Sequence, residues 1–458
     1  MRTRGNEDSC VLVAGLFRVD VRVLRPALMT ENKGAVDLFV VLSRASTADA
    51  PQDRESDSSV GKGGAASAAA EVDDDDVMAG AEASLPPGTA MTANGPVPFA
   101  GNILDSPDIV WMDDCWTKEE EEEALRVVHG KGQPLSTFWR ETFEREARKS
   151  WDLFYRRNGD KFFKDRHYLG KVFPELAETE GDRDLAKEIE IAQGIKGEDS
   201  GGDGASRRNE TVVSNRGRLG RRTLLELGCG VGNAVFPLLE ENRGLYVVAV
   251  DLSPRGIEVL KKHPMYTCGR CEASVLDATS DELPPHVLED GGVDLVLLQF
   301  SLSAVAPKDM AAVARLVEKA LKPGGKVLIR DYGRLDEAQL RFAKGRRLGD
   351  NVYVRQASSL DGTMSSFFSL EDLRHLFCGG SSPGPPRQGQ GREPRQQRRR
   401  QYGDATTPRL LRDYGGDGGG ARLIEEELSF VRRQYANRAQ KVSRRRVWVH
   451  AKFRKPLV

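Results

Sequence analysis

The sequence predicts an α/β protein with a doubly wound, mostly parallel sheet and an antiparallel last strand. Five short apolar runs alternate with helical patterns between residues 221 and 378. Strands that alternate with helices imply a parallel sheet covered on both faces. A glycine-rich turn follows the first run, where such sheets bind ligands. Apolar and polar residues alternate from Val447 to Phe453, which indicates a final strand with one solvent-facing side.

The composition narrows the class of protein. The 458 residues have room for two or three domains, and their net charge of -1 argues against a uniformly basic nucleic-acid coat protein. The sequence has no apolar run of about eighteen residues, so no membrane span is predicted. Six scattered Cys residues are not typical of a secreted disulfide framework, and Cys268 and Cys271 form a lone C-x-x-C, so no metal site is predicted. We expect a cytoplasmic protein, with import into mitochondria or plastids as the alternative.

The first half of the chain divides by composition. Residues 1–98 form an extension that we expect to be largely disordered, because residues 46–98 are rich in Ala, Gly, Ser, Asp and Pro. Residues 99–177 form an N-terminal segment that we expect to be helical. Thr117 and the Glu residues after it suit a capped helix start, and the helical pattern continues with interruptions to about Tyr155. Residues 178–220 are charged and Gly-rich, as in a flexible insertion.

The predicted core covers residues 221–378. Its five strands are expected at RTLLELG, YVVAVDLS, CEASVLDA, VDLVLLQFS and KVLIRDYG, which begin at Arg222, Tyr246, Cys271, Val293 and Lys326. A low-complexity insertion follows at residues 379–420. Residues 421–458 supply the last strands of the core and are basic.

The glycine-rich turn carries the clearest chemical signal. Gly228, Gly230 and Gly232 form a G-x-G-x-G pattern, and Asn233 stands where a dinucleotide fingerprint needs its third glycine. No Lys followed by Ser or Thr is present, so a nucleotide phosphate loop is disfavoured. A tight turn without a ligand is the structural alternative. Asp251 follows Gly228 by 23 positions, where a carboxylate can accept both hydroxyl hydrogens of a ribose.

This spacing resembles the first motif of class I S-adenosylmethionine-dependent methyltransferases, which have a Rossmann-like fold. The resemblance implies S-adenosylmethionine as the cofactor. It also implies that Asp277 and the backbone of Ala278, at the end of the third strand, lie beside the adenine. Gln299, Phe300 and Ser301, at the end of the fourth strand, are expected to face the cofactor. Taken alone, Asp251 and Asp277 would more often be solvated caps.

Four further blocks are more specific. They are WDLFYRRNGDKFFKDRHYL from Trp151, LSAVAPKDM from Leu302, RDYGRLDEAQLRF from Arg330, and LGDNVYVRQ with DGTMSSFF between Leu348 and Phe368. Together they resemble the tRNA N3-methylcytidine methyltransferases, which modify a cytidine of the anticodon loop. The resemblance covers about residues 99–377 apart from the insertion, and it resumes from about Arg432. The block FAGNILDSPDIVWMDDCW resembles the branch acting on threonine and arginine tRNAs more than the serine branch.

The resemblance implies roles for individual residues. Trp151 and Tyr155, four apart on one helix face, would lie over the cofactor, whereas residues so spaced usually pack in a core. Interleaved aromatic and basic side chains suit stacking on bases and contact with phosphates, with a solvated surface as the alternative. The residues expected to bind tRNA are Phe162, Phe163, Lys164, Arg166, His167, Arg341 and Arg355.

The end of the chain and the fifth strand complete the expected site. Ten Lys or Arg residues and no Asp or Glu lie between Val431 and Val458, as in a surface that follows a phosphate backbone; a charge-protected edge strand is the alternative. Cytosine N3 already carries a lone pair, so the site must align the base more than it must remove a proton. Asp331 is the candidate that stabilises the cationic product, with Arg330 organising the nucleotide. A structural cap is the alternative for Asp331.

Three functions are compatible with these patterns. The first is a tRNA methyltransferase that forms N3-methylcytidine, with threonine or arginine tRNAs favoured and serine tRNAs as an alternative. The second is a class I methyltransferase acting on a protein or a small molecule, and the third is a non-catalytic RNA-binding partner with a degenerate cofactor site. The complete set of glycines and aspartates speaks against degeneracy. The resemblance also implies a helper protein such as a tRNA synthetase, and no membrane partner is expected.

Overall fold

The computed structural model describes residues 13–14, 17–18, 85, 88–92, 94–194, 220–289, 291–355, 362–379, 421–438 and 441–457. The chain divides into two units, residues 1–66 and 67–458. In the first unit, β1 (Val13–Ala14) pairs antiparallel with β2 (Phe17–Arg18). Most of the extension expected to be disordered, residues 195–219 and nearly all of the 379–420 insertion lie outside the described residues.

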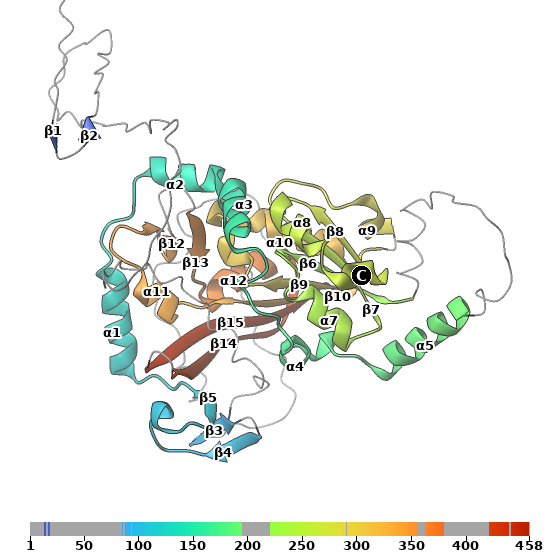
Figure 1. The fold of residues 1–458 in the computed structure, drawn as a ribbon, viewed down its shortest axis with the longest axis horizontal. Coiled ribbons are helices and arrows are strands. Elements are labelled where there is room, and N and C mark those ends of the chain that lie inside the picture. The colour runs from blue at the N-terminus through green and yellow to red at the C-terminus, as the bar shows by residue number, and fades with distance from the viewer. Residues whose placement is uncertain are drawn as a thin grey trace, which may run out of the picture. The chain divides into compact units, whose positions relative to one another are not determined.

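A ten-stranded sheet organises the second unit (Figure 1). Its strand order is β4-β3-β5-β14-β15-β10-β9-β6-β7-β8. The five strands predicted for the core form its parallel half: β6 (Arg222–Leu227), β7 (Leu245–Asp251), β8 (Cys271–Val275), β9 (Val293–Gln299) and β10 (Leu321–Tyr332). The doubly wound α/β core is therefore confirmed, and the other half of the sheet is antiparallel.

Helices cover both faces of the parallel half. Alternate residues of β7 serve different faces: Val248 and Val250 pack into one apolar cluster, and Val247 and Ala249 pack into the other. The first cluster takes in α9 (Pro285–Glu289), α10 (Met310–Ala320) and α12 (Leu370–Cys378). The second takes in α4 (Leu169–Val172), α7 (Val235–Glu241) and α8 (Pro254–Leu260). Burial on both faces explains why these strands are continuous apolar runs in the sequence.

The N-terminal segment begins with strands and continues with helices. Helix α1 (Lys118–His129) starts as predicted, because the Thr117 hydroxyl accepts from the Glu120 N–H and the Glu120 carboxylate accepts from the Thr117 N–H. Helices α2 (Thr137–Arg145) and α3 (Ala147–Asn158) follow.

Part of the extension expected to be disordered belongs to the sheet. Strands β3 (Thr89–Thr92) and β4 (Gly95–Pro98) pair with each other, and β3 pairs with β5 (Ile109–Asp113). Two prolines made β4 look unlike a strand, but proline is tolerated at a sheet edge, and β4 is the edge strand.

A helix occupies the start of the segment predicted as a flexible insertion. Helix α5 (Glu180–Gly194) is anchored by Asp182, which is buried and forms an ion pair with Arg222 of β6 at 2.6 Å. The two residues are 40 positions apart, so the local charge pattern did not reveal the contact.

The last two strands lie inside the sheet. Strands β14 (Ile424–Asn437) and β15 (Val442–Arg454) pair antiparallel, and β15 also pairs antiparallel with β10, which confirms the antiparallel last strand. The expected solvent-facing side from Val447 to Phe453 is wrong. Trp448 and His450, on the alternate face, are 0% and 6% exposed, because the N-terminal segment covers that face.

A three-stranded antiparallel sheet stands apart from the large one. It contains β11 (Arg347–Gly349), β12 (Val352–Arg355) and β13 (Thr363–Ser366), and α11 (Glu337–Arg341) precedes it. Buried Tyr353 and Phe367 pack with Tyr332 at the end of β10, which joins this small sheet to the core. Throughout the described residues, the helices are too short or too polar to cross a membrane.

Candidate active site

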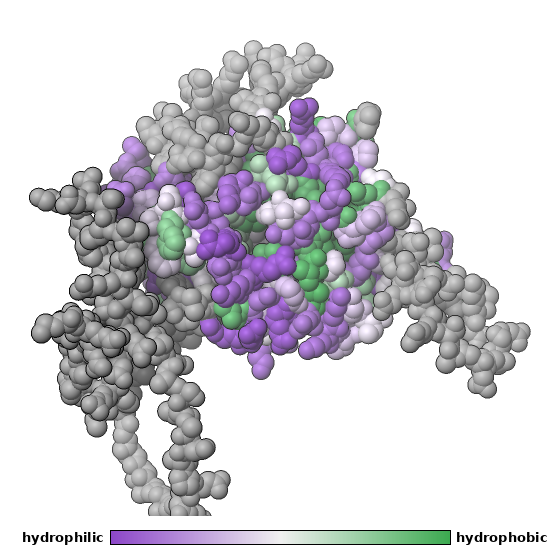
Figure 2. All heavy atoms as spheres, turned by 90° about the horizontal axis from the view of Figure 1, so that it is seen from above, coloured by the Kyte–Doolittle hydropathy of each residue, from purple (hydrophilic) through white to green (hydrophobic). Residues whose placement is uncertain are grey.

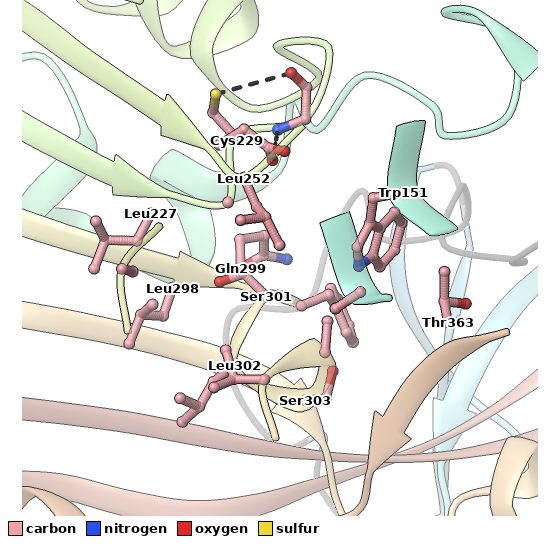
Figure 3. Close-up of a pocket in the computed structure, with 18 of the residues that line it drawn as sticks. Trp151, Leu227, Cys229, Leu252, Leu298, Gln299, Ser301, Leu302, Ser303 and Thr363 are labelled. Atoms are coloured by element: carbon pink, nitrogen blue, oxygen red, sulfur yellow. Dashed lines mark hydrogen bonds between the residues drawn. The ribbon is translucent and has the colours of Figure 1, made fainter. Parts of the chain in front are cut away.

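A cavity of about 260 Å³ lies beyond the carboxyl ends of β6, β7, β8 and β9 (Figure 3). This is the position at which doubly wound sheets bind ligands. The cavity is lined by all eight residues expected to bind the cofactor: Trp151, Tyr155, Gly228, Gly230, Asp251, Asp277, Ala278 and Gln299. The structure therefore brings together residues that are up to 148 positions apart in the sequence.

The glycine loop has to be glycine because other elements pass too close to it. Gly228 has a φ of 79°, and a Cβ there would lie 2.5 Å from the Ser301 Cβ. Gly230 has a φ of 55°, and a Cβ there would lie 2.6 Å from the Tyr155 hydroxyl oxygen. Side chains at these positions would displace the walls of the cavity, so the loop is shaped for close approach of the backbone.

Helix α3 forms a wall of the cavity opposite the glycine loop. Its Trp151 and Tyr155 rings stack with their centroids 5.8 Å apart, as expected for residues on one helix face. Asp152 holds the helix in place, because its carboxylate accepts hydrogen bonds from the Ser253 hydroxyl and from the Arg255 N–H at the start of α8. In Figure 3, Gln299 and Ser301 lie below Cys229 of the glycine loop and to the left of Trp151.

Two buried carboxyl groups give the cavity its electrostatic character. Asp251 accepts from the Gly230 N–H and the Ser253 N–H, both at 2.8 Å, yet burial raises its pKa to about 6. Burial raises the pKa of Glu226 to about 8, although nearby Arg166 opposes the shift. A cationic ligand beside these groups would favour their charged forms.

Asp277 and Ala278, the residues expected beside the adenine, line the cavity just beyond the end of β8. The Asp277 carboxylate accepts from the Thr279 N–H at 3.0 Å and from the Thr279 hydroxyl at 2.6 Å. It therefore also serves as the local cap that was its structural alternative. A carboxylate has about four lone-pair sites, so this turn leaves Asp277 able to accept from a ligand as well.

Three buried oxygens in the cavity wall test whether S-adenosylmethionine fits. They are Glu226 Oε2, Gln299 Oε1 and Ser301 Oγ, and none has a hydrogen-bond partner among the residues that the structure describes. Buried polar atoms are normally paired, so acceptors in a cavity wall indicate a ligand that donates. The amino group of S-adenosylmethionine is such a donor, and its sulfonium charge suits the carboxyl groups. The residues present therefore fit this cofactor.

The residues expected to bind tRNA separate into two groups. Phe162, Phe163, Arg166 and Arg355 line the cavity, and the rings of Phe162 and Phe163 pack on Phe154 of α3. Lys164, His167 and Arg341 are exposed and do not line it. Arg166 is only 8% exposed and donates to the Tyr168 hydroxyl at 3.1 Å, so a solvated surface is not its environment.

The small sheet forms the second half of the cavity. Thr363, Met364 and Ser365 of β13 line it. Arg355 of β12 donates to the Ser365 hydroxyl at 2.8 Å, and its guanidinium lies 5.3 Å from the Tyr332 ring centroid. Hydroxyl, guanidinium and aromatic groups are the kinds that recognise an unstacked base.

Arg330 and Asp331 are not in the cavity wall. Asp331 is fully buried, and its two carboxylate oxygens accept from the Ser303 N–H at 2.9 Å and from the Tyr332 N–H at 2.8 Å. Arg330 is 1% exposed, and its guanidinium lies 4.9 Å from the Trp448 ring centroid. As neighbours on β10 the two side chains lie on opposite faces of the sheet, and neither lines the cavity, so the geometry does not support direct contact with a base. Asp331 instead holds Ser303, which lines the cavity.

The basic run at the end of the chain is mainly structural. Its charges form ion pairs with acidic residues far away in the sequence: Arg433 with Asp113, Arg444 with Glu337, Arg446 with Asp336, and Lys452 with Glu175 and Glu427. Arg433 and Arg446 are buried. These four residues do not form the expected phosphate surface, because each is paired with a carboxylate. They do not protect an edge strand either, because β15 lies inside the sheet.

The sequence left one cavity residue without a role, and it gave no sign of the backbone conformation of another, Phe300, which was expected to face the cofactor. No role was assigned to Glu226, which lies two residues before Gly228 and lines the cavity. A carboxylate at the last-but-one position of a buried strand was the sequence signal that could have identified it. Phe300 has a φ of 53°, which is rare for a residue with a Cβ, and its N–H donates to the Arg330 carbonyl at 2.8 Å. No sequence pattern signals that conformation, which turns the chain at the end of β9 into the cavity wall.

The chain is similar to known proteins both within residues 225–327 and over a longer part of its sequence. Residues 225–327 match the family model described as a methyltransferase domain. The mouse tRNA N(3)-cytidine methyltransferase METTL6 is 43% identical over 262 residues, which is 56% of this chain and 76% of the mouse protein. The zebrafish tRNA N(3)-cytidine methyltransferase METTL2 is 36% identical over 351 residues, which is 76% of this chain and 84% of its own. The Drosophila melanogaster tRNA N(3)-methylcytidine methyltransferase Mettl2 is 33% identical over 352 residues, 76% of this chain and 83% of the fly protein.

The function named for these relatives is consistent with the residues that line the cavity. A methyltransferase domain covers the glycine loop, Asp251 and Asp277, and the cavity offers a donor ligand its buried acceptors, so S-adenosylmethionine is the cofactor. The shared sequence extends well beyond that domain, over more than three quarters of two relatives. The chain belongs to the tRNA N(3)-cytidine methyltransferase family.

Proposed function

We propose that this chain transfers a methyl group from S-adenosylmethionine to N3 of a cytidine in the anticodon loop of tRNA. The observation that carries the proposal is the joined cavity. One half has the glycine loop and buried carboxyl groups, and the other has Tyr332, Arg355 and the hydroxyl groups of β13. A methyl donor and a base can therefore meet within one enclosure. Three relatives named for this activity support it.

The chemistry asks for alignment more than for proton transfer. When bound, S-adenosylmethionine supplies an electrophilic methyl group. One bond forms between cytosine N3 and the methyl carbon while the carbon–sulfur bond breaks and its electron pair stays on sulfur. No proton has to leave N3, so the transfer needs no general base.

The residues of the chain hold and desolvate the two reactants. Asp251 and Gly230 would hold the ribose side of the cofactor, and Trp151 and Tyr155 would cover it from α3. Phe300 and Tyr332, whose ring centroids lie 5.1 Å apart, would wall the base, with Arg355 donating to it. The product base is cationic, and the carboxyl groups of Glu226 and Asp251 would stabilise positive charge in this enclosure.

The finer assignments rest on the sequence. Threonine or arginine tRNAs are the proposed substrates, because residues 99–116 resemble that branch, with serine tRNAs as the alternative. A tRNA synthetase is the proposed kind of helper. A cytoplasmic location is proposed from the composition, with mitochondria or plastids as the alternative.

The proposal is tested with purified protein and anticodon stem-loop RNA. We expect wild-type protein with S-adenosylmethionine to form N3-methylcytidine, detected by nucleoside mass spectrometry. The same RNA with uridine at the target position should receive no methyl group, and Asp251→Asn should lose activity while it stays folded. Because a helper is proposed, the assay is repeated with a cell extract added. Label transferred to protein or to small molecules in that extract, with no transfer to tRNA, would contradict the proposal.

A further inference from the structure

Helix α2 exposes two adjacent aromatic side chains beside the cavity. Phe138 is 65% exposed and Trp139 is 48% exposed. Seven large hydrophobic side chains of the described residues are exposed, and these two are the aromatic ones among them. Single exposed hydrophobic side chains are common on protein surfaces, but large exposed rings that touch each other indicate a contact surface. Figure 2, which looks onto the end of the molecule where α2 and α3 lie, shows apolar residues in small groups on a mostly hydrophilic face.

The two rings are held in place from beneath. The Trp139 ring stacks on Phe143 with centroids 6.1 Å apart and planes inclined by 28°. The Phe138 ring meets Trp139 edge-on at 5.4 Å. Phe143 in turn packs on the backbone at Gly362, where a Cβ would come within 2.5 Å of the Phe143 ring. Trp139 is therefore an ordered flat surface with one side supported and much of its area exposed.

This aromatic surface is continuous with the rim of the cavity. Gly362, beneath Phe143, is followed directly by Thr363, which lines the cavity. On the other side, Glu144 of α2 also lines the cavity and forms an ion pair with Lys308 at 2.8 Å. That ion pair fixes α2 to the segment before α10, so the rings stay beside the cavity mouth.

We propose that Phe138 and Trp139 stack on unpaired bases that flank the base in the cavity. The inference rests on the proposed function and names the part of the RNA that this surface takes. Flat rings suit nucleobases because every base has a flat face, and stacking of this kind tolerates different sequences. Arg140, next to Trp139, and Lys308, with a side chain 52% exposed, share Glu144 as their ion-pair partner. One carboxylate stands against two cations there, so the three side chains together remain positive toward the connecting phosphates. A loop of RNA with splayed bases is the ligand that combines these features.

The test compares Trp139→Ala and Trp139→Phe with wild type, using an anticodon stem-loop RNA. We expect Trp139→Ala to raise KM for the RNA about 10-fold with kcat and cofactor affinity little changed. Trp139→Phe should keep most of the wild-type KM, because it retains a ring. Ile191→Ala removes another exposed apolar side chain, 62% exposed on α5, and should leave KM unchanged. Thermal unfolding of each variant checks that the protein is folded.

The outcomes separate this inference from the proposed function. If wild type methylates the RNA and Trp139→Ala has the wild-type KM, the stacking surface is refuted and the function stands. If the KM is unchanged but Trp139→Ala alters the mass of the particle in sedimentation, the surface contacts a protein or a second copy, which also overturns the inference. If wild type methylates no RNA but Trp139→Ala still weakens RNA binding, measured by fluorescence anisotropy of a labelled stem-loop, only the function has failed.

Discussion

Replacing Gly230 with Ala tests the contact between the glycine loop and α3. The φ of 55° at Gly230 is left-handed, which costs a residue with a Cβ about 1–2 kcal/mol. The new Cβ would lie 2.6 Å from the Tyr155 hydroxyl oxygen, and Tyr155 has little room to move because it is 5% exposed and lies against Gly256. Forced overpacking of this kind costs about 1–3 kcal/mol. We therefore expect Gly230→Ala to lower the free energy of unfolding by about 2–5 kcal/mol.

Two matched variants separate the backbone strain from the clash. Gly269 has a φ of 73° with nothing within 4 Å of an added Cβ, so Gly269→Ala should lose only about 1–2 kcal/mol. Adding Tyr155→Phe to Gly230→Ala removes the oxygen at 2.6 Å and leaves the ring carbon at 3.4 Å, so it should recover about 1–3 kcal/mol relative to the single changes. Urea unfolding measures these values. Of the two glycine variants, only Gly230→Ala should bind S-adenosylmethionine more weakly in calorimetry. Equal losses for the two glycine variants, or no recovery with Tyr155→Phe, would refute the steric argument.

Three other predictions concern buried charges. The pKa of Glu226 is raised to about 8 in the folded protein, so folding takes up a proton between pH 4.5 and 8, and the stability contributed by this group is lost as the pH rises through that window. Glu226→Gln should remove this loss. Identical pH profiles of the urea midpoint for the variant and wild type would contradict the raised pKa. Asp331→Asn replaces one acceptor by a donor, so the Ser303 or Tyr332 N–H loses its partner and stability should fall by about 1–3 kcal/mol in urea; an unchanged midpoint would show that these hydrogen bonds contribute nothing. Arg446→Ala should destabilise by about 3–5 kcal/mol because it leaves Asp336 buried without its ion pair, while the salt dependence of RNA binding stays unchanged. A lower salt slope with normal stability would instead make Arg446 a phosphate contact.

The parallel half of the fold was predictable because its signal is local. Each core strand is a short apolar run that ends at the cavity, so the strand after the glycine loop was enough to place Asp251, and the family resemblance added Asp277. The start of α1 was equally local, since Thr117 and Glu120 cap each other within one turn. Such features need only the periodicity of an element and the chemistry of its ends.

The remaining features depend on contacts across the fold. The pairing of Arg433 with Asp113 spans 320 positions, so a count of charges near the end of the chain could not show that its cations were already neutralised. The direction of Asp331 depends on the register of β10 between β9 and β15, and that register turned the side chain into the protein. The aromatic surface of α2 is invisible in sequence because Phe138 and Trp139 are residues that usually lie in a core.

The central claim is tested most directly by nucleoside mass spectrometry of total tRNA from cells that lack this protein. The account predicts that N3-methylcytidine falls, and that wild-type protein restores it. Asp251→Asn, which keeps the size of the side chain but not its charge, should fail to restore it although it is present and folded. Unchanged N3-methylcytidine in cells without a second such enzyme, or full restoration by Asp251→Asn, would contradict the account.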